Sequence, residues 1–302
     1  MLRLLLSVLL FFHGFIHVMG FARAIGTRDD SLRVLSNPLG IAWLGTALLL
    51  MTAALLQLIG ERVWWLPALC GLLVSQVLII SAWGDARWGT IGNVLLFLPA
   101  IGAFFSARFE QRYRNDVRHA LQNEPPATTL LTEADLLSLP SPVRKYIRLT
   151  GAIGRPRPKS VRLVFEGTMR SRTKSWFPFH SEQYDCFGKY ERMFFMKADF
   201  GGWVIPGYHY YAGGSASMEV RPFGIIPVVN LRSKELFRAE TVTMLNDICL
   251  FAPGALVDPR ITWTSVDDHC AESHFCNEGI CVHARLYFNE RGELVNFVSD
   301  DR

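Results

Sequence analysis

The chain has 302 residues, half of them hydrophobic, and a formal net charge of +4. A charge this small and dispersed gives no reason to expect nucleic acid as a partner. A glycine-rich phosphate loop, a serine elbow and a dinucleotide fingerprint are all missing from the sequence, which argues against the common nucleotide-binding and hydrolase classes.

Residues 1–106 contain four apolar stretches, whose one charged residue is Arg3 near the start of the first. Each is close to the ~17–25 residues that a helix needs to cross a bilayer. Backbone groups in lipid must be satisfied within their own segment, so we expect a four-helix transmembrane domain. The first stretch ends in an A-x-A pattern like a signal-peptide cleavage site, but its length favours retention as a helix. The stretches are Leu2–Phe21, Leu39–Ile59, Val63–Trp83 and Trp88–Phe105.

The arginines near the ends of these helices predict how the bundle is oriented. Six lie on the side of the N-terminus and four on the other, which favours both termini in the cytoplasm. Six cysteines, if they are free thiols, fit a reducing compartment. The six arginines are Arg3, Arg62, Arg108, Arg112, Arg114 and Arg118, and the four are Arg23, Arg28, Arg33 and Arg87.

After the membrane stretches, residues 107–130 read as a basic juxtamembrane helix and linker, and residues 131–302 as one soluble domain. From Ser160 the apolar pattern has a period of two, which predicts strands. One long helix, capped by Ser233 and ended near Ala252-Pro253, interrupts them before a closing meander at 261–298. The order predicts an α+β domain in which a curved antiparallel sheet packs on one long helix.

Several motifs carry a family resemblance. They are similar to an uncharacterised bacterial family, a domain of unknown function often preceded by membrane helices. The resemblance implies a protein of the bacterial inner membrane with a C-terminal α+β domain, and it implies no activity. Such proteins continue beyond the equivalent of Arg302, so we expect the last strands to be missing here. The motifs are Leu139–Tyr146, Gly154–Pro158, Leu245–Cys249, Leu286–Asn289 and His13–His17.

Two acids lie on an apolar face of the predicted long helix. At 100° per residue, Glu240 and Asp247 share a stripe with Phe237, Met244 and Phe251. A buried carboxylate costs several kcal/mol unless it is paired or protonated. The acids are therefore either a polar anchor or acid–base pair in a cavity between helix and sheet, or a structural pair with an inward Arg or Tyr.

An aromatic, glycine-rich segment precedes this helix and contains Trp203, Tyr208 and Tyr210. Such rings favour interfaces between apolar and aqueous surroundings. They are therefore candidates for lining the mouth of a pocket or for inserting into the bilayer surface. Ordinary packing within the sheet is the alternative.

A predicted hairpin about Glu278-Gly279 places four metal-ligand side chains on one face. A two-residue turn puts Cys276 opposite Cys281 and His274 opposite His283. Two thiols and two imidazoles are zinc ligands, although the spacing matches no zinc finger. A cross-strand disulfide and free side chains are the other possibilities.

His13 and His17 lie four residues apart in the first apolar stretch and so share a helix face. Ionisable groups inside a membrane often mark a site, so a metal ion or a haem iron is a candidate ligand. The alternative is hydrogen bonding to polar residues of the other helices, such as Ser75, Gln76 and Asn93.

Together these patterns favour a membrane-anchored protein that binds an apolar or lipid-like ligand between sheet and long helix. In this hypothesis the chain is not an enzyme and needs no cofactor, and its partners are the bilayer and the ligand. A membrane enzyme using Asp247 and Glu240, and a structural or assembly subunit of a membrane complex, remain alternatives.

Overall fold

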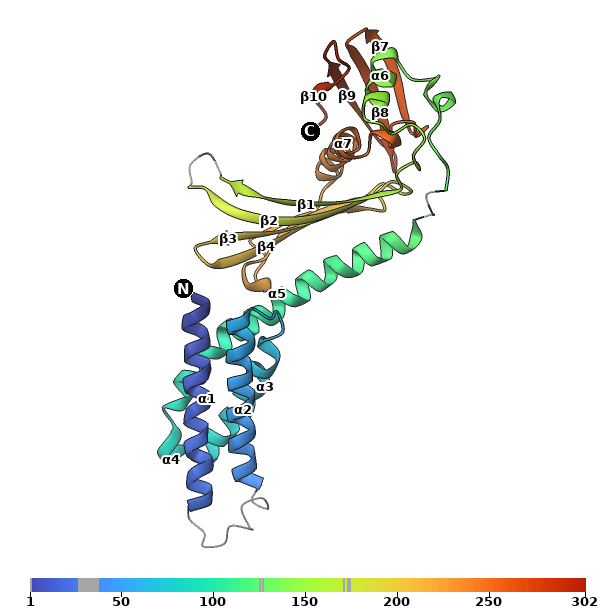
Figure 1. Ribbon diagram of the computed structural model, residues 1–302. Coiled ribbons are helices and arrows are strands. Elements are labelled where there is room, and N and C mark those ends of the chain that lie inside the picture. Colours follow the sequence, from blue (N-terminus) through green and yellow to red (C-terminus); the bar gives the residue numbers. More distant parts are fainter. Residues whose placement is uncertain (1, 27–37, 125, 127, 171, 173–174) are drawn as a thin grey trace. The chain divides into compact units, whose positions relative to one another are not determined.

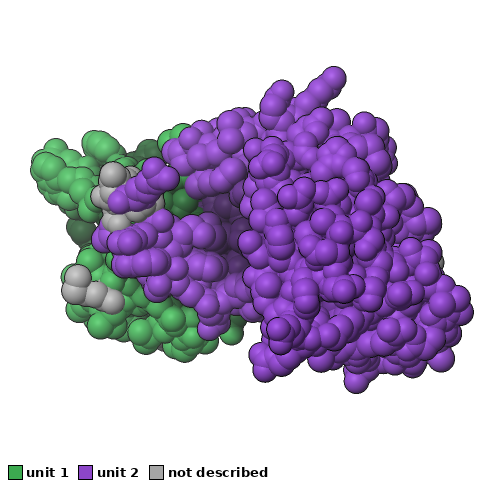
Figure 2. Space-filling model, turned by 90° about the horizontal axis from the view of Figure 1, so that it is seen from above, with its two compact units in different colours: residues 1–109, 199–205, 221–226 green, residues 110–198, 206–220, 227–302 purple. Residues whose placement is uncertain are grey.

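The computed structural model describes the chain except residues 1, 27–37, 125, 127, 171 and 173–174. Arg28 and Arg33, which the orientation argument used, therefore lie outside the described residues. The chain divides into two units, coloured in Figure 2. The helical unit comprises residues 1–109, 199–205 and 221–226, and the α+β unit comprises residues 110–198, 206–220 and 227–302.

The helical unit confirms a membrane-embedded protein. Among the described residues, three helices are long and apolar enough to cross a membrane, namely α1, α2 and α5, whereas α3 has only 17 residues. The predicted count of four spans is thus not confirmed. The helices are α1 (Leu2–Gly26), α2 (Pro38–Ile59), α3 (Trp65–Ser81), the short α4 (Trp83–Ala86) and α5 (Gly89–Asn123), seen in Figure 1.

The helices of this unit run in alternating directions. The Arg3 guanidinium at the start of α1 donates to the carbonyl of Gln57, 2.6 Å away, at the end of α2. The Gln76 amide near the end of α3 donates to the Thr90 hydroxyl near the start of α5, at 3.2 Å. Leu10 and Leu50 are fully buried between helices, while many outward leucines are exposed, as lipid-facing side chains should be.

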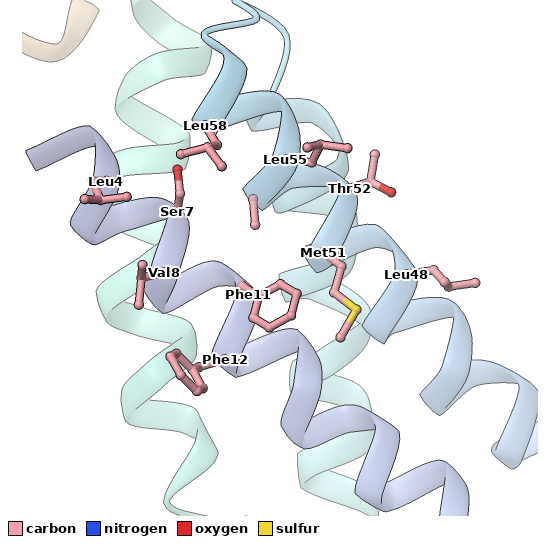
Figure 3. A pocket seen from close by; sticks show the side chains of 11 residues that line it. Leu4, Ser7, Val8, Phe11, Phe12, Leu48, Met51, Thr52, Leu55 and Leu58 are labelled. Carbon is pink, nitrogen blue, oxygen red and sulfur yellow. The ribbon is translucent and has the colours of Figure 1, made fainter.

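An apolar groove of about 530 Å³ lies between side chains of α1 and α2 on the side of the bundle (Figure 3). Phe11, Phe12 and Met51 line it, and the Ser7 hydroxyl beside them donates to the carbonyl of Arg3. With an apolar lining of this kind, the groove offers a surface suited to the acyl chains of a bilayer.

The α+β unit contains a six-stranded antiparallel sheet in the order β1-β2-β3-β4-β5-β6, so each strand pairs with its neighbours in sequence. β1 and the three-residue β6 are its edges. The strands are β1 (Ser160–Met169), β2 (Phe177–Cys186), β3 (Glu191–Phe200), β4 (Trp203–Ala212), β5 (Ser215–Val220) and β6 (Val229–Leu231).

The last four strands form a second sheet in the order β10-β9-β8-β7, which corrects the expectation of a single curved sheet. The 18-residue α7 separates the two sheets in sequence. It contacts β5 of the first sheet and β9 of the second, so the two sheets need not pair with each other. The elements are α7 (Lys234–Phe251), β7 (Ile261–Asp267), β8 (Cys270–Asn277), β9 (Ile280–Phe288) and β10 (Leu294–Val298).

The core of this unit surrounds α7. The Ser233 hydroxyl caps the helix by accepting from the Leu236 amide at 3.1 Å, as the sequence predicted. Met244 and Ile248 of α7 are fully buried in one cluster with Phe275 of the second sheet. Short helices complete the unit, namely η2 (Glu133–Leu136), α6 (Ser141–Leu149) and η4 (Pro253–Ala255), while η3 (Pro222–Gly224) belongs to the helical unit.

Helices cover both faces of the six-stranded sheet (Figure 1). On one face lies α7. Residues 110–123 of α5 lie on the other face. There the Tyr113 ring stacks on Phe195 with centroids 5.2 Å apart, and the Tyr208 hydroxyl donates to Asp116 at 2.9 Å. Successive side chains of a strand alternate between the faces, so each position of β1–β5 points to one helix or the other.

Candidate functional site

The two acids predicted on the apolar stripe of the long helix are buried. Glu240 and Asp247 lie two helical turns apart on α7, and each is 8% exposed. The buried face of α7 also includes Phe237 and Met244, as the helical period predicted. Two carboxylates in such surroundings require partners from the sheet.

Arg192 of β3 supplies the countercharge. Its Nε donates to Asp247 at 3.0 Å, its Nη1 to Glu240 at 2.8 Å and its Nη2 to the Gln183 carbonyl at 2.9 Å. The amide nitrogen of Gln183 in turn donates to Asp247 at 2.8 Å and to both oxygens of Asp185. We call Gln183, Asp185, Arg192, Glu240 and Asp247 the charge cluster. An inward Arg was one of the two readings that the sequence left open.

The charge cluster holds three carboxyl groups but one guanidinium, and their pKa values differ accordingly. Burial, together with the nearby Asp247 carboxylate, raises the pKa of Asp185 to about 7. Burial likewise raises the pKa of Asp247 despite its bonds to Arg192 and Gln183. Burial pushes the Glu240 carboxyl in the same direction, but a hydrogen bond from His209 and the charge of Arg192 outweigh it and lower its pKa. Of the three carboxyl groups, Asp185 therefore titrates near neutral pH.

His209 of β4 touches the edge of the charge cluster. Its Nδ1 lies 3.3 Å from a Glu240 oxygen, and its ring meets Phe194 edge-on with centroids 5.6 Å apart. The sequence did not identify His209, Arg192, Gln183 or Asp185 as site residues. A signal was present in β2, where polar Ser181, Gln183 and Asp185 alternate at the spacing of one sheet face.

The same face of the sheet becomes apolar away from the cluster. Phe165 of β1 contacts Phe251 of α7 with ring centroids 5.9 Å apart, and pairing places Phe165 opposite Ser181 and Ser181 opposite Met196. Five half-buried side chains here form what we call the apolar strip. They are Leu163, Phe165, Phe179, Phe194 and Met196.

One polar group lies within the apolar strip. Ser181 is fully buried, and its hydroxyl has no hydrogen-bond partner among the residues that the structure describes. A buried hydroxyl without a partner costs on the order of 1–3 kcal/mol, so its presence calls for an explanation.

The structure does not bring the predicted aromatic residues to this site. Tyr208 is buried on the opposite face of the sheet, bonded to Asp116, and the Tyr210 ring lies beside it with centroids 6.2 Å apart. Trp203, at the start of β4, belongs to the helical unit, where its half-exposed ring contacts Phe223. Of the five predicted ligand-binding residues, Glu240 and Asp247 are therefore the two that lie in the charge cluster.

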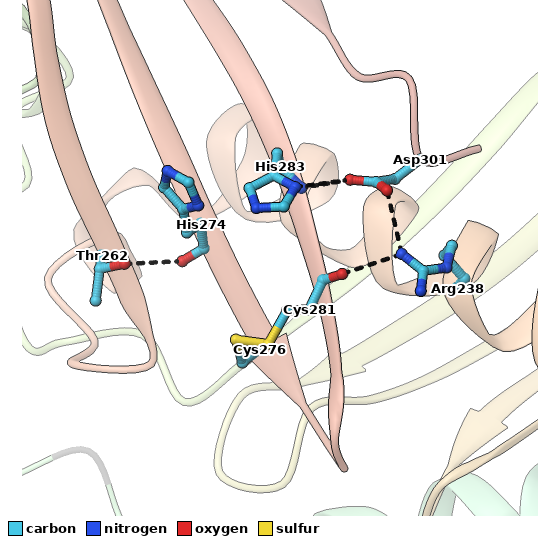
Figure 4. Close-up of a disulfide and its surroundings, with 7 residues drawn as sticks. All are labelled: Arg238, Thr262, His274, Cys276, Cys281, His283 and Asp301. Atoms are coloured by element: carbon cyan, nitrogen blue, oxygen red, sulfur yellow. Dashed lines mark hydrogen bonds and ion pairs between the residues drawn. A yellow bond between two sulfur atoms is a disulfide. The ribbon is translucent and has the colours of Figure 1, made fainter.

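The predicted hairpin register is confirmed. Cys276 pairs with Cys281 and His274 with His283, as a two-residue turn requires. The two sulfur atoms form a disulfide, so they are not thiolate ligands in this state, and His283 bonds Asp301 instead (Figure 4). Across the described part of the chain, no three His, Cys, Asp or Glu side chains converge as a metal site would require. Zinc at His274, Cys276, Cys281 and His283 thus stays a prediction for the reduced hairpin.

His13 and His17 are both buried in the helical unit, with ring centroids 5.1 Å apart. His13 bonds Asn93, and His17 bonds Ser75. These are partners that the sequence named for the hydrogen-bonding alternative. A metal or haem at this pair also stays a prediction.

Comparison with known proteins agrees with the resemblance seen in the motifs. No curated protein and no solved structure shows significant similarity to the chain. A family model matches residues 129–302, which hold the charge cluster, the apolar strip and the hairpin disulfide. The chain therefore belongs to a family of unknown function, DUF6544.

Proposed function

We propose that the protein binds a lipid-like ligand on the α7 face of the six-stranded sheet, while its helices anchor it in the membrane. The observation that carries this proposal is the apolar strip with the unpaired Ser181 hydroxyl inside it. A half-buried row of large apolar side chains gains free energy when an apolar chain covers it. A polar atom of the ligand that inserts between the strip side chains down to the buried Ser181 would supply the hydrogen bond that this hydroxyl lacks among the described residues.

The charge cluster selects the head group of such a ligand. Phe194 of the strip lies under the Arg192 guanidinium, 5.3 Å from its ring centroid, so strip and cluster are adjacent. Three carboxyl groups outnumber one guanidinium, and His209 already bonds Glu240. An anionic head group would meet like charge, whereas a neutral or cationic one would not. The ligand class that fits is a long-chain alcohol or amine rather than a fatty acid.

A second candidate is an enzyme that uses the same cluster. The observation in its favour is the His209–Glu240 contact of 3.3 Å, since a carboxylate beside an imidazole is an arrangement used for proton transfer. Asp247, the other acid of that hypothesis, already accepts from Arg192 and Gln183. We therefore favour binding over catalysis.

Filling the apolar strip should abolish ligand binding. Gly167 lies on the strip face of β1, and a Cβ there would approach the Phe179 ring to 3.3 Å. We expect Gly167→Leu to block the strip, whereas Thr168→Leu, on the opposite face of the same strand, is the matched control. The measurement is native mass spectrometry of the detergent-purified full chain incubated with octadecanol, octadecylamine or stearate.

The wild-type chain and Thr168→Leu should carry one octadecanol or octadecylamine per chain and at least about tenfold less stearate. Gly167→Leu should lose the adduct. Equal occupancy by stearate would refute the head-group assignment, and equal adducts in both variants would refute the site.

We also propose that α3 completes four membrane spans. Its 17 residues extend about 25 Å, near the lower limit for a bilayer span. The alternating helix directions return α5 to the side of Arg3 and Arg62, which with Arg108 favour the cytoplasm. The α+β unit would then be cytoplasmic. The Cys276–Cys281 disulfide, a bond typical of oxidising compartments, argues for the opposite orientation.

Cysteine labelling in cells distinguishes the two orientations. In a background without native cysteines, Gly84→Cys, where an added Cβ meets no atom within 4 Å, should react with an impermeant maleimide in cells with a permeable outer membrane. Glu166→Cys, whose native side chain is 80% exposed, should react only after lysis. The reverse pattern would place the α+β unit outside.

A further inference from the structure

A chain of polar side chains runs through the helical unit. His13 Nε2 lies 2.7 Å from the Asn93 carbonyl oxygen, and His17 Nε2 lies 2.8 Å from the Ser75 hydroxyl. The Asn93 amide nitrogen donates to Gln76 at 3.0 Å, which fixes the orientation of the Asn93 side chain. Polar and ionisable groups inside a membrane are costly and tend to mark functional sites.

The partners of the two imidazoles dictate where their protons lie. The Asn93 carbonyl oxygen can only accept, so His13 Nε2 carries the hydrogen. His17 Nδ1 lies 2.9 Å from the carbonyl oxygen of His13, so it also carries a hydrogen, and both nitrogens of His17 are engaged. In neutral His13 the remaining nitrogen, Nδ1, is a bare acceptor, and no residue that the structure describes donates to it.

His13 borders an open space. A cavity of about 880 Å³ lies beside His13, with Trp43 and Trp88 among its apolar lining and the Arg23–Asp85 ion pair also contributing. Its size is within the range of small-molecule sites. Gly92 borders the cavity, and a Cβ at this position would lie 2.9 Å from His13 Nδ1, so a glycine is what keeps the nitrogen accessible.

We propose that this intramembrane cavity binds a small amphiphile whose hydroxyl or N–H group donates a hydrogen bond to His13 Nδ1, with an aromatic or alicyclic body between the tryptophans. The donor satisfies His13 Nδ1, the one nitrogen of the histidine pair without a partner among the described residues. The apolar walls receive the body of the ligand, which enters from the bilayer. This site is separate from the apolar strip and does not depend on it.

A pair of probes that differ only in the donor tests the proposal. We would titrate the full-length chain in detergent micelles with 2-naphthol and with 2-methoxynaphthalene by calorimetry. Gly92→Ala brings a methyl group against His13 Nδ1 without changing the histidine. Gly45→Ala, where an added Cβ meets nothing within 4 Å, is the matched control for a glycine-to-alanine change in a membrane helix.

We expect 2-naphthol to bind one site saturably and at least about tenfold more tightly than its methyl ether, the effect of one hydrogen bond. Gly92→Ala should remove this preference, and Gly45→Ala should retain it. Equal binding of the two probes by the wild-type chain, or an unchanged preference in Gly92→Ala, would overturn the proposal. The probe comparison in the wild-type chain stands even if a variant fails to fold.

Discussion

Arg192→Leu is expected to destabilise the α+β unit by about 3–5 kcal/mol, because it leaves three buried carboxyl groups without their cation. Arg192 contacts Glu240 at 2.8 Å and Asp247 at 3.0 Å, and both acids are 8% exposed. Both carboxylates would stay largely buried between α7 and the sheet. Scanning calorimetry of the thermal melting of the full chain in detergent measures this loss of stability.

Arg162→Leu is the matched control, since it removes another arginine–carboxylate pair on the same sheet. Arg162 bonds Glu182 at 2.7 Å, but its side chain is 58% exposed. Exposed pairs contribute about 0–1 kcal/mol, so its melting temperature should change little. Equal destabilisation by the two variants would mean that the charge cluster is hydrated and that its burial does not govern the effect.

The stability of the α+β unit should fall as the pH rises through neutrality. The pKa of Asp185 is raised in the folded state from 3.8 to about 7, so the folded chain holds a proton that the unfolded chain has released. Its contribution is fully present below about pH 4 and is lost as the pH passes about 7. The shift in the pKa of Asp247 has the same sign, whereas Glu240, with a lowered pKa, matters only at more acidic pH.

Asp185→Asn should flatten this dependence. Asparagine is neutral at every pH and keeps an oxygen for the bond from Gln183. Between pH 5 and pH 8 we expect the wild-type melting temperature to fall by roughly 5–10 °C, because the part of the raised pKa of Asp185 that falls in this range is equivalent to about 3 kcal/mol. The same slope in Asp185→Asn would show that another group controls the pH dependence.

Local patterns predicted much of this fold. The apolar stretches identified the membrane helices, and opposed cysteines and histidines identified the β8–β9 register, because a turn between two adjacent strands fixes their pairing. The start of β4 is harder to predict, because the strand begins at Trp203 and runs through Pro206 and Gly207, which resemble a break. Proline is tolerated in strands at few positions, so this pair would normally end a predicted strand.

The candidate site was predictable only in part. The helical period showed that Glu240 and Asp247 share a buried face, but not which cation they meet. Arg192 is 48 residues from Glu240 in sequence, and their contact depends on how α7 crosses β3. His13 and His17 were visible at once, yet the free nitrogen of His13 depends on Asn93, 80 residues away. Contacts set by tertiary packing leave no periodic signal in the chain.

The edge strand β1 leaves one row of backbone donors and acceptors of the six-stranded sheet open, because β2 is its one partner among the described strands. The strand at the other edge, β6, has three residues and is too short to pair with much of another strand. β1 has ten residues, and Arg162 and Glu166 protect it as charged residues protect edge strands elsewhere. Beyond Glu166 the strand carries Gly167, Thr168 and Met169 and has no charge. This short stretch of the six-stranded sheet is therefore open to intermolecular β-sheet pairing and thus to self-association.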